Sequence, residues 1–165
     1  MSQGIAIEGM KLVIDNLPVA YDTPADLTAR ANMMSAAMMG ATAFQKGLGA
    51  IHALSHPIGA IYHTHHGTTN AVCMPAVLRL NADKIHDRFD RVTSYLGIEG
   101  GFDGFCEFVD RFNDGFKIPK RMSDLGVTDP DIDRLVAGAL ADPSCGGNPV
   151  ELTKDNLRHL LEKVI

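Results

Sequence analysis

Apolar residues recur at intervals of three and four along almost the whole chain, which is the spacing of one face of an α-helix. In the last segment this face consists of Leu157, Leu160, Leu161 and Val164. No segment of useful length alternates between apolar and polar residues, as a strand with one buried face does. The sequence therefore predicts a single all-α domain of seven or eight helices over residues 1–165, with no internal boundary.

Prolines and capping residues predict where several of these helices begin and end. The first helix is expected to stop at Pro18, and the next to begin with Thr23 as its N-cap and Pro24 in its first turn. Because this second helix is built largely of Ala, Met and Gly, we expect it to be central and buried. A later helix is predicted from about 130 to 141, and Thr153 is the predicted N-cap of the last helix.

Composition and charge exclude several classes of protein. The formal net charge of −5 argues against a nucleic-acid partner, since proteins that bind the phosphate backbone usually carry a basic patch. Cys73, Cys106 and Cys145 are odd in number and lack C-x-x-C spacing, which argues against a disulfide framework or a thiolate zinc site. No apolar run reaches the roughly 18 residues of a membrane span, and the N-terminal residues lack a signal-peptide pattern. We therefore expect a cytoplasmic protein with no membrane partner.

Five of the seven histidines lie in one stretch, GAIHALSHPIGAIYHTHHGTTNA, residues 49–71. They are His52, His56, His63, His65 and His66. Imidazole is a common ligand of first-row metals and also transfers protons near neutral pH. The spacing of the histidines alone does not distinguish a metal site from ordinary histidines of the core or the surface.

Within this stretch, His52 and His56 are four residues apart, which places them one turn apart on the same face of a helix. His66 stands at the expected start of the next helix. The first-turn donors there are expected to be capped by one of the residues that follow it, Thr68, Thr69 or Asn70.

Residues 47–81, GLGAIHALSHPIGAIYHTHHGTTNAVCMPAVLRLN, resemble without a gap a segment of the iron-containing, group III metal-dependent alcohol dehydrogenases. The flanking stretches, including NPVELTKDNLRHLLEKVI, also resemble the C-terminal half of that family, and none resembles its N-terminal half. The resemblance implies the all-α C-terminal domain of the dehydroquinate synthase-like fold. It also implies an NAD- or NADP-dependent enzyme that transfers hydride between a small alcohol and the corresponding aldehyde.

The resemblance further implies roles for three of the histidines. His52 and His66 match family ligands of a divalent metal, Fe²⁺ or alternatively Zn²⁺. His56 matches a residue near metal and substrate that helps proton transfer. His65 replaces the family's usual proline and His63 lies at a variable position, so neither inherits a role, and we expect both to face solvent.

The remaining family ligands, an Asp and a His in a DxxxH motif, have no counterpart here, because no carboxylate before His52 is followed by a histidine four residues later. A nucleotide-binding domain is absent from residues 1–165 as well. We therefore expect a C-terminal fragment that binds metal weakly and is inactive alone. It would pack against a missing N-terminal domain and form homo-oligomers through an apolar face exposed around the histidines. The alternative is a free-standing helical metal-binding or interaction module without catalytic activity, with HTHH as its chelator.

Overall fold

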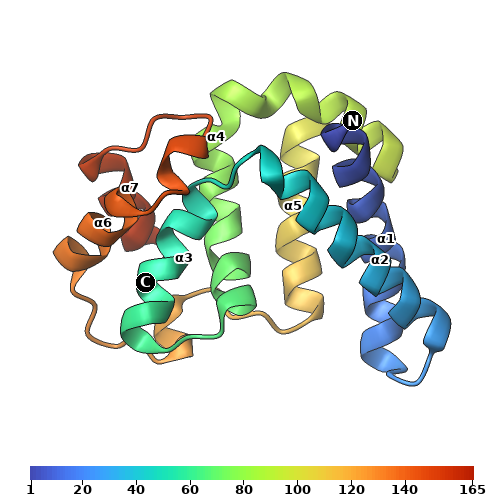
Figure 1. Cartoon of the computed structure of the whole chain (residues 1–165), viewed down its shortest axis with the longest axis horizontal. Helices are drawn as coiled ribbons and strands as arrows, with labels where there is room; N and C mark the ends of the chain where they lie inside the picture. The colour runs from blue at the N-terminus through green and yellow to red at the C-terminus, as the bar shows by residue number, and fades with distance from the viewer.

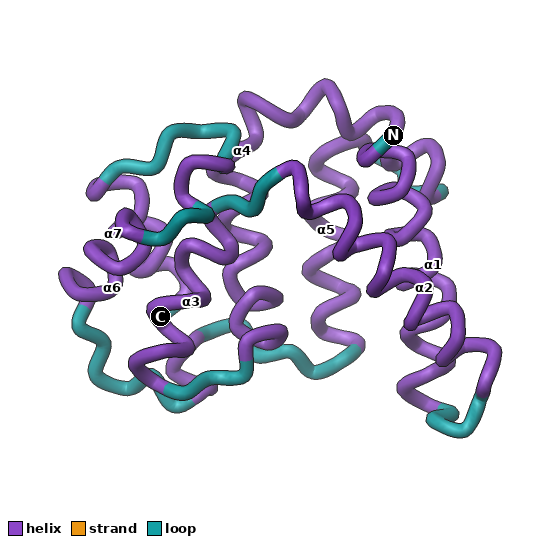
Figure 2. Tube along the Cα trace, in the orientation of Figure 1, coloured by secondary structure: helices purple, strands orange, loops and turns teal.

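The computed structural model describes all residues from 1 to 165 as α-helices, short 3₁₀ helices and loops, without a strand (Figure 1 and Figure 2). The seven α-helices are α1 (Ser2–Asp22), α2 (Leu27–Ala43), α3 (Ala50–Tyr62), α4 (His66–Leu96), α5 (Gly101–Gly115), α6 (Ile132–Ala141) and α7 (Lys154–Val164). The 3₁₀ helices are η1 (Phe44–Lys46), η2 (Met122–Leu125) and η3 (Cys145–Gly147). The predicted all-α fold is confirmed. None of the helices combines the length and the apolar character that crossing a bilayer would require.

Two groups of helices are joined by the long helix α4. Figure 1 shows α1 and α2 side by side at one end of the molecule and α3, α6 and α7 at the other, with α5 packed against α4. The larger hydrophobic core has 17 buried residues and lies between α3, α4, α6 and α7. It includes the predicted apolar face of α7, Leu157, Leu160, Leu161 and Val164. A smaller core joins α4 and α5 and contacts α1.

Two predicted boundaries near the α1–α2 connection are wrong. Pro18 lies inside α1, which continues beyond it. Pro18 cannot donate a hydrogen bond to the carbonyl of Ile14, and the packing of α1 on α2 outweighs that cost. α2 begins at Leu27, and its N-cap is Asp26 rather than Thr23, because Asp26 Oδ1 accepts a hydrogen bond from the backbone N–H of Ala29 at 2.9 Å.

α2 lies at the surface, which contradicts the prediction of a central, buried helix. Only two of its residues, both alanines, are buried, whereas Met34 and Met38 are 74% and 66% exposed. The close approach of α1 and α2 depends instead on Gly9 of α1, where a Cβ atom would lie 3.2 Å from Cβ of Met39 on α2. Composition indicates how closely a neighbour can approach a helix, and not how many neighbours surround it.

The exposed apolar side chains of α2 are expected to promote self-association. Leu27, Met34 and Met38 lie on one face of this helix at spacings of seven and four. Apart from Met1, which precedes α1, the large exposed apolar side chains of the chain belong to α1, α2, η1 and α4, and none belongs to α3. We expect light scattering to show a dimer or larger species at high concentration, and a smaller species for the double variant Met34→Gln/Met38→Gln. A monomeric wild-type chain would contradict this expectation.

A pair of asparagines anchors the start of α3. Asn148 Nδ2 donates to Asn81 Oδ1 at 2.8 Å, and Asn81 Nδ2 donates to Asn148 Oδ1 at 3.0 Å. The same Asn148 Oδ1 accepts a hydrogen bond from the backbone N–H of Ala50 at 3.1 Å. The adjacent Gly147 packs directly against the backbone of Leu48. These contacts attach α3 both to α4 and to the loop between η3 and α7.

Candidate metal site

α3 and the first turn of α4 bring three of the histidines together. His52 and His56 lie one turn apart on α3, and His66 is the first residue of α4. The ring centroids of His52 and His56 are 5.5 Å apart, those of His52 and His66 5.3 Å, and those of His56 and His66 5.5 Å. The structure therefore groups the three histidines to which the family resemblance assigns roles.

His63 and His65 shape the turn between α3 and α4 and do not join this cluster. His63 ends α3 in the left-handed conformation, with φ of 57°. His65 is the N-cap of α4, because its Nδ1 accepts a hydrogen bond from the backbone N–H of Thr68 at 3.3 Å. An imidazole nitrogen thus fills the place that a hydroxyl or carboxylate usually takes, and the prediction that Thr68, Thr69 or Asn70 caps this helix is wrong. Both histidines are exposed.

Asn70, one turn beyond His66, contacts two of the clustered imidazoles. Its Nδ2 lies 3.1 Å from Nε2 of His66 and 3.4 Å from Nε2 of His52. Its Oδ1 is buried and has no hydrogen-bond partner. The two Nε2 atoms therefore face one point from two different helices, an arrangement that spacing along the sequence does not indicate.

Asp142 contacts the third histidine of the cluster. Its Oδ2 lies 2.8 Å from Nδ1 of His56, and its Oδ1 accepts a hydrogen bond from the backbone N–H of Ser144 at 2.8 Å. Asp142 is the C-cap of α6, and its side chain is only 11% exposed. Sequence reasoning missed this residue because 86 positions separate it from His56, and no motif links them.

The surroundings favour a neutral His52 and an ionised Asp142. Burial lowers the pKa of His52 below 6.5, and repulsion by protonated His56 and His66 lowers it further, against the attraction of Asp142. Burial acts to raise the pKa of Asp142, but the hydrogen bonds from Ser144 and His56 outweigh burial and bring the pKa below 3.8. A neutral imidazole is the form that binds a metal ion.

These interactions predict opposite changes in the pKa of His52 for two substitutions. His56→Gln removes a neighbouring positive charge and should raise the pKa of His52, whereas Asp142→Asn removes a negative charge and should lower it. NMR titration of the histidine ring protons measures both changes, and shifts in the same direction would contradict the prediction. Because folded His52 binds its proton less readily than unfolded His52, this group makes the free energy of unfolding fall as the pH drops below about 6.5.

The cluster fits part of a metal site. Nε2 of His52 and Nε2 of His66 face the same point, as two ligands of one ion must. No three or more His, Cys, Asp or Glu side chains of the chain are grouped so that they could hold a metal ion. Zinc and similar ions usually take about four ligands, so further donors would have to come from outside these residues.

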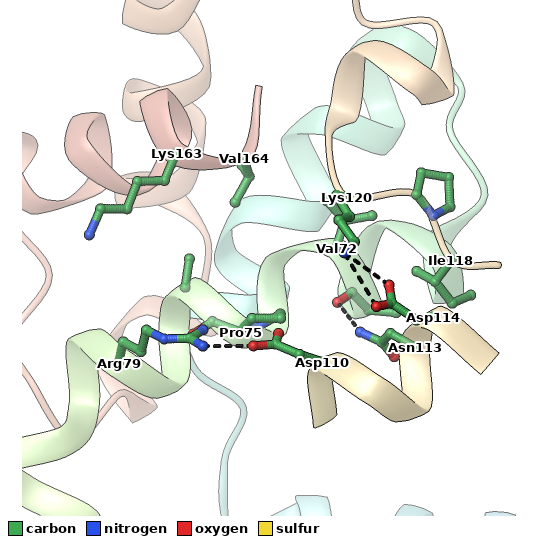
Figure 3. A pocket seen from close by; sticks show the side chains of 13 residues that line it. Val72, Pro75, Arg79, Asp110, Asn113, Asp114, Ile118, Lys120, Lys163 and Val164 are labelled. Carbon is green, nitrogen blue, oxygen red and sulfur yellow. Dashed lines mark hydrogen bonds and ion pairs between the residues drawn. The ribbon is translucent and has the colours of Figure 1, made fainter. Parts of the chain in front are cut away.

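Figure 3 shows a cavity between α4, α5 and α7. Its volume is about 440 Å³, and no histidine lines it. Most of its charges are already paired: Arg79 lies 2.8 Å from Asp110, and Lys120 lies 3.2 Å from Asp114. A smaller cavity of about 330 Å³ at the start of α3 is lined in part by His52.

Known proteins resemble this chain over its whole length. The sequence pattern of the Fe-containing alcohol dehydrogenase family, C-terminal, matches residues 1–165. The 4-hydroxybutyrate dehydrogenase of Cupriavidus necator is 39% identical over 171 residues, which cover 98% of this chain and 44% of that protein. The NAD-dependent methanol dehydrogenase of Bacillus methanolicus is 30% identical over 173 residues, which cover 100% of this chain and 45% of that protein. The crystal structure of a 1,3-propanediol oxidoreductase matches with a TM-score of 0.93 and 26% identity, over 99% of this chain and 45% of that one.

The fold and the sequence together match the C-terminal helical domain that these proteins share. The chain belongs to the Fe-containing alcohol dehydrogenase family. It spans less than half the length of the curated relatives that it matches, 44% and 45% for the two dehydrogenases above. The family expected from residues 47–81 is thereby confirmed.

Proposed function

We propose that this chain supplies the helical wall of the active site of an NAD- or NADP-linked alcohol dehydrogenase, with His52 and His66 as two ligands of a divalent ion. The observation that carries the proposal is that Nε2 of His52 and Nε2 of His66 lie 3.4 and 3.1 Å from the same amide nitrogen. The family's name points to iron, and zinc also suits imidazole ligands. When bound, such an ion polarises the oxygen of an alcohol and eases its deprotonation.

In this proposal His56 carries the proton between the substrate and solvent. Asp142 holds Nδ1 of His56 at 2.8 Å, so Nε2 is the nitrogen left to accept a proton. The ionised carboxylate also stabilises the imidazolium that forms when His56 accepts that proton. The backbone N–H of Ser144 keeps the carboxylate in place. Asp142 therefore acts through His56, as a positioning residue.

The remaining metal ligands and the nucleotide site are proposed to belong to an N-terminal α/β domain. The chain spans 44% and 45% of two relatives that are named as dehydrogenases, one of them NAD-dependent. Their names, which refer to 4-hydroxybutyrate and methanol, support a small alcohol or its aldehyde as the substrate class. Since two imidazoles leave an ion short of its usual number of ligands, the chain alone should bind metal weakly and lack dehydrogenase activity.

Metal titrations and activity assays on the 165-residue chain test this proposal against a free-standing module. We expect weak binding of Co²⁺ at one ion per chain, lost in His52→Ala and His66→Ala and retained in His63→Asn and His65→Ala. We also expect no oxidation of alcohols with NAD or NADP. Tight binding that depends on His63 or His65 would instead favour the module, and oxidation at an ordinary enzyme rate would contradict the fragment proposal.

A further inference from the structure

A single carboxamide bridges the two imidazoles that are the proposed metal ligands. His52 lies on α3, whereas His66 and Asn70 lie one turn apart on α4. The 3.4 and 3.1 Å contacts of Asn70 Nδ2 therefore connect a ring on one helix to a ring on the other. The relative orientation of the two rings depends on this one side chain as well as on the packing of α3 against α4.

The distances at Asn70 have the size expected between neighbouring ligands of one ion. Two atoms bound at about 2.1 Å, with an angle between about 90° and 109° at the ion, lie about 3.0–3.4 Å apart. Asn70 Nδ2 lies 3.1 Å from Nε2 of His66 and 3.4 Å from Nε2 of His52. The end of the Asn70 side chain therefore lies where both Nε2 lone pairs point.

The chemistry of the amide selects one form of each ring. Nδ2 of Asn70 can only donate, so Nε2 of His52 and Nε2 of His66 must accept. A neutral imidazole that accepts at Nε2 carries its proton on Nδ1, and this tautomer presents the Nε2 lone pair to a metal. The opposite assignment of the amide would place its oxygen toward both rings and require both to carry a proton on Nε2.

The carbonyl oxygen of the Asn70 side chain shows that this orientation of the amide is energetically unfavourable at one atom. Oδ1 of Asn70 is buried and accepts no hydrogen bond. A buried acceptor without a partner is unfavourable, and such groups are few in folded proteins. The two contacts with the imidazoles are therefore the only side-chain hydrogen bonds that keep the amide in place.

We infer that Asn70 is a positioning residue of the metal site, which holds His52 and His66 with their Nε2 lone pairs directed at a common point before an ion binds. This inference rests on the proposed function, in which these two rings are ligands. Asn70 acts through the two imidazoles, and its amide nitrogen withdraws when an ion takes their lone pairs.

Titration with Co²⁺ and ¹⁵N NMR of the 165-residue chain test this inference. Asn70→Ala should weaken Co²⁺ binding about tenfold or more, the size typical for residues that orient metal ligands. Asn70→Asp should bind Co²⁺ at least about tenfold more tightly than the wild type, because a carboxylate oxygen at this spacing adds a third ligand. At about pH 8 the wild-type His52 and His66 should carry their protons on Nδ1, and Asn70→Ala should show a mixture of tautomers.

Asn32→Ala is the matched control, since Asn32 donates to Asn16 between α2 and α1 and does not contact the histidines. Unchanged or tighter Co²⁺ binding by Asn70→Ala would overturn the inference, and so would Asn70→Asp binding no more tightly than the wild type. If Asn70→Ala does not fold, the Co²⁺ affinity of Asn70→Asp and the tautomers of His52 and His66 in the wild type test the inference. If Co²⁺ binding survives in His52→Ala and His66→Ala, the proposed function itself is refuted. If these two variants lose Co²⁺ binding while Asn70→Ala binds normally, only the inference about Asn70 is refuted.

Discussion

Gly147→Ala is expected to lower the free energy of unfolding by about 3 kcal/mol or more, or to prevent folding altogether. A Cβ atom at this position would lie 1.9 Å from the carbonyl oxygen of Leu48. That oxygen belongs to the backbone, so no side-chain rotation can relieve the clash, and either η3 or the loop before α3 must move. Asn148, the next residue, would then lose its hydrogen bond to the backbone N–H of Ala50, and the start of α3 would be released.

Thermal unfolding followed by circular dichroism measures this effect. For a chain of this size, a loss of about 3 kcal/mol corresponds to a fall in Tm of roughly 6–12 °C. The neighbouring Gly146 is the matched control, because a Cβ atom there would meet nothing within 4 Å. Gly146→Ala should change the stability by no more than about 0.5 kcal/mol. Equal melting of the two variants would show that Gly147 does not pack tightly against Leu48.

His66→Ala is expected to reduce alcohol oxidation by about 10³-fold or more once the active site is complete. A suitable enzyme is a chimera in which this chain replaces the matching C-terminal part of the Cupriavidus necator 4-hydroxybutyrate dehydrogenase, which is 39% identical to it. The loss should be large because removal of one imidazole weakens the binding of the ion on which polarisation of the substrate oxygen depends. The metal content of the purified variant should fall together with its activity.

His63→Asn is the matched control for this experiment. His63 lies in the same stretch, and asparagine tolerates its left-handed backbone conformation well. We expect this variant to retain both metal and activity. A chimera whose activity survives His66→Ala, or disappears equally in His63→Asn, would show that His66 does not serve as a ligand.

Local sequence signals predicted those parts of the fold that depend on neighbouring residues. The last helix is the clearest case, because Thr153 Oγ1 accepts a hydrogen bond from the backbone N–H of Asn156 at 3.3 Å, and Asn156 Oδ1 accepts one from the backbone N–H of Thr153 at 2.8 Å. A cap of this kind closes over three residues and involves no other helix. The apolar face that follows it is buried as its spacing predicts.

Two causes explain the wrong predictions: nearby residues compete for the N-cap position, and helices distant in the sequence decide which side chains are buried. Thr23 and Asp26 are both good capping residues, and only the course of the chain after α1 selects Asp26. His65 caps α4 although histidine is not among the preferred capping residues. The exposure of Met34 on α2 depends on how many helices surround α2, which its own composition does not determine.

The four-residue spacing of His52 and His56 is enough to place both on one face of a helix, because that relation depends on no other part of the chain. The packing of the helices on one another is needed to bring Asp142 to His56 and to place Asn70 between His52 and His66. The contacts of Asp142 with His56 and of Asn70 with His52 join different elements, α3 with the end of α6 and α3 with α4. Their geometry is set by the packing of the shared core, and no periodicity along the chain records it.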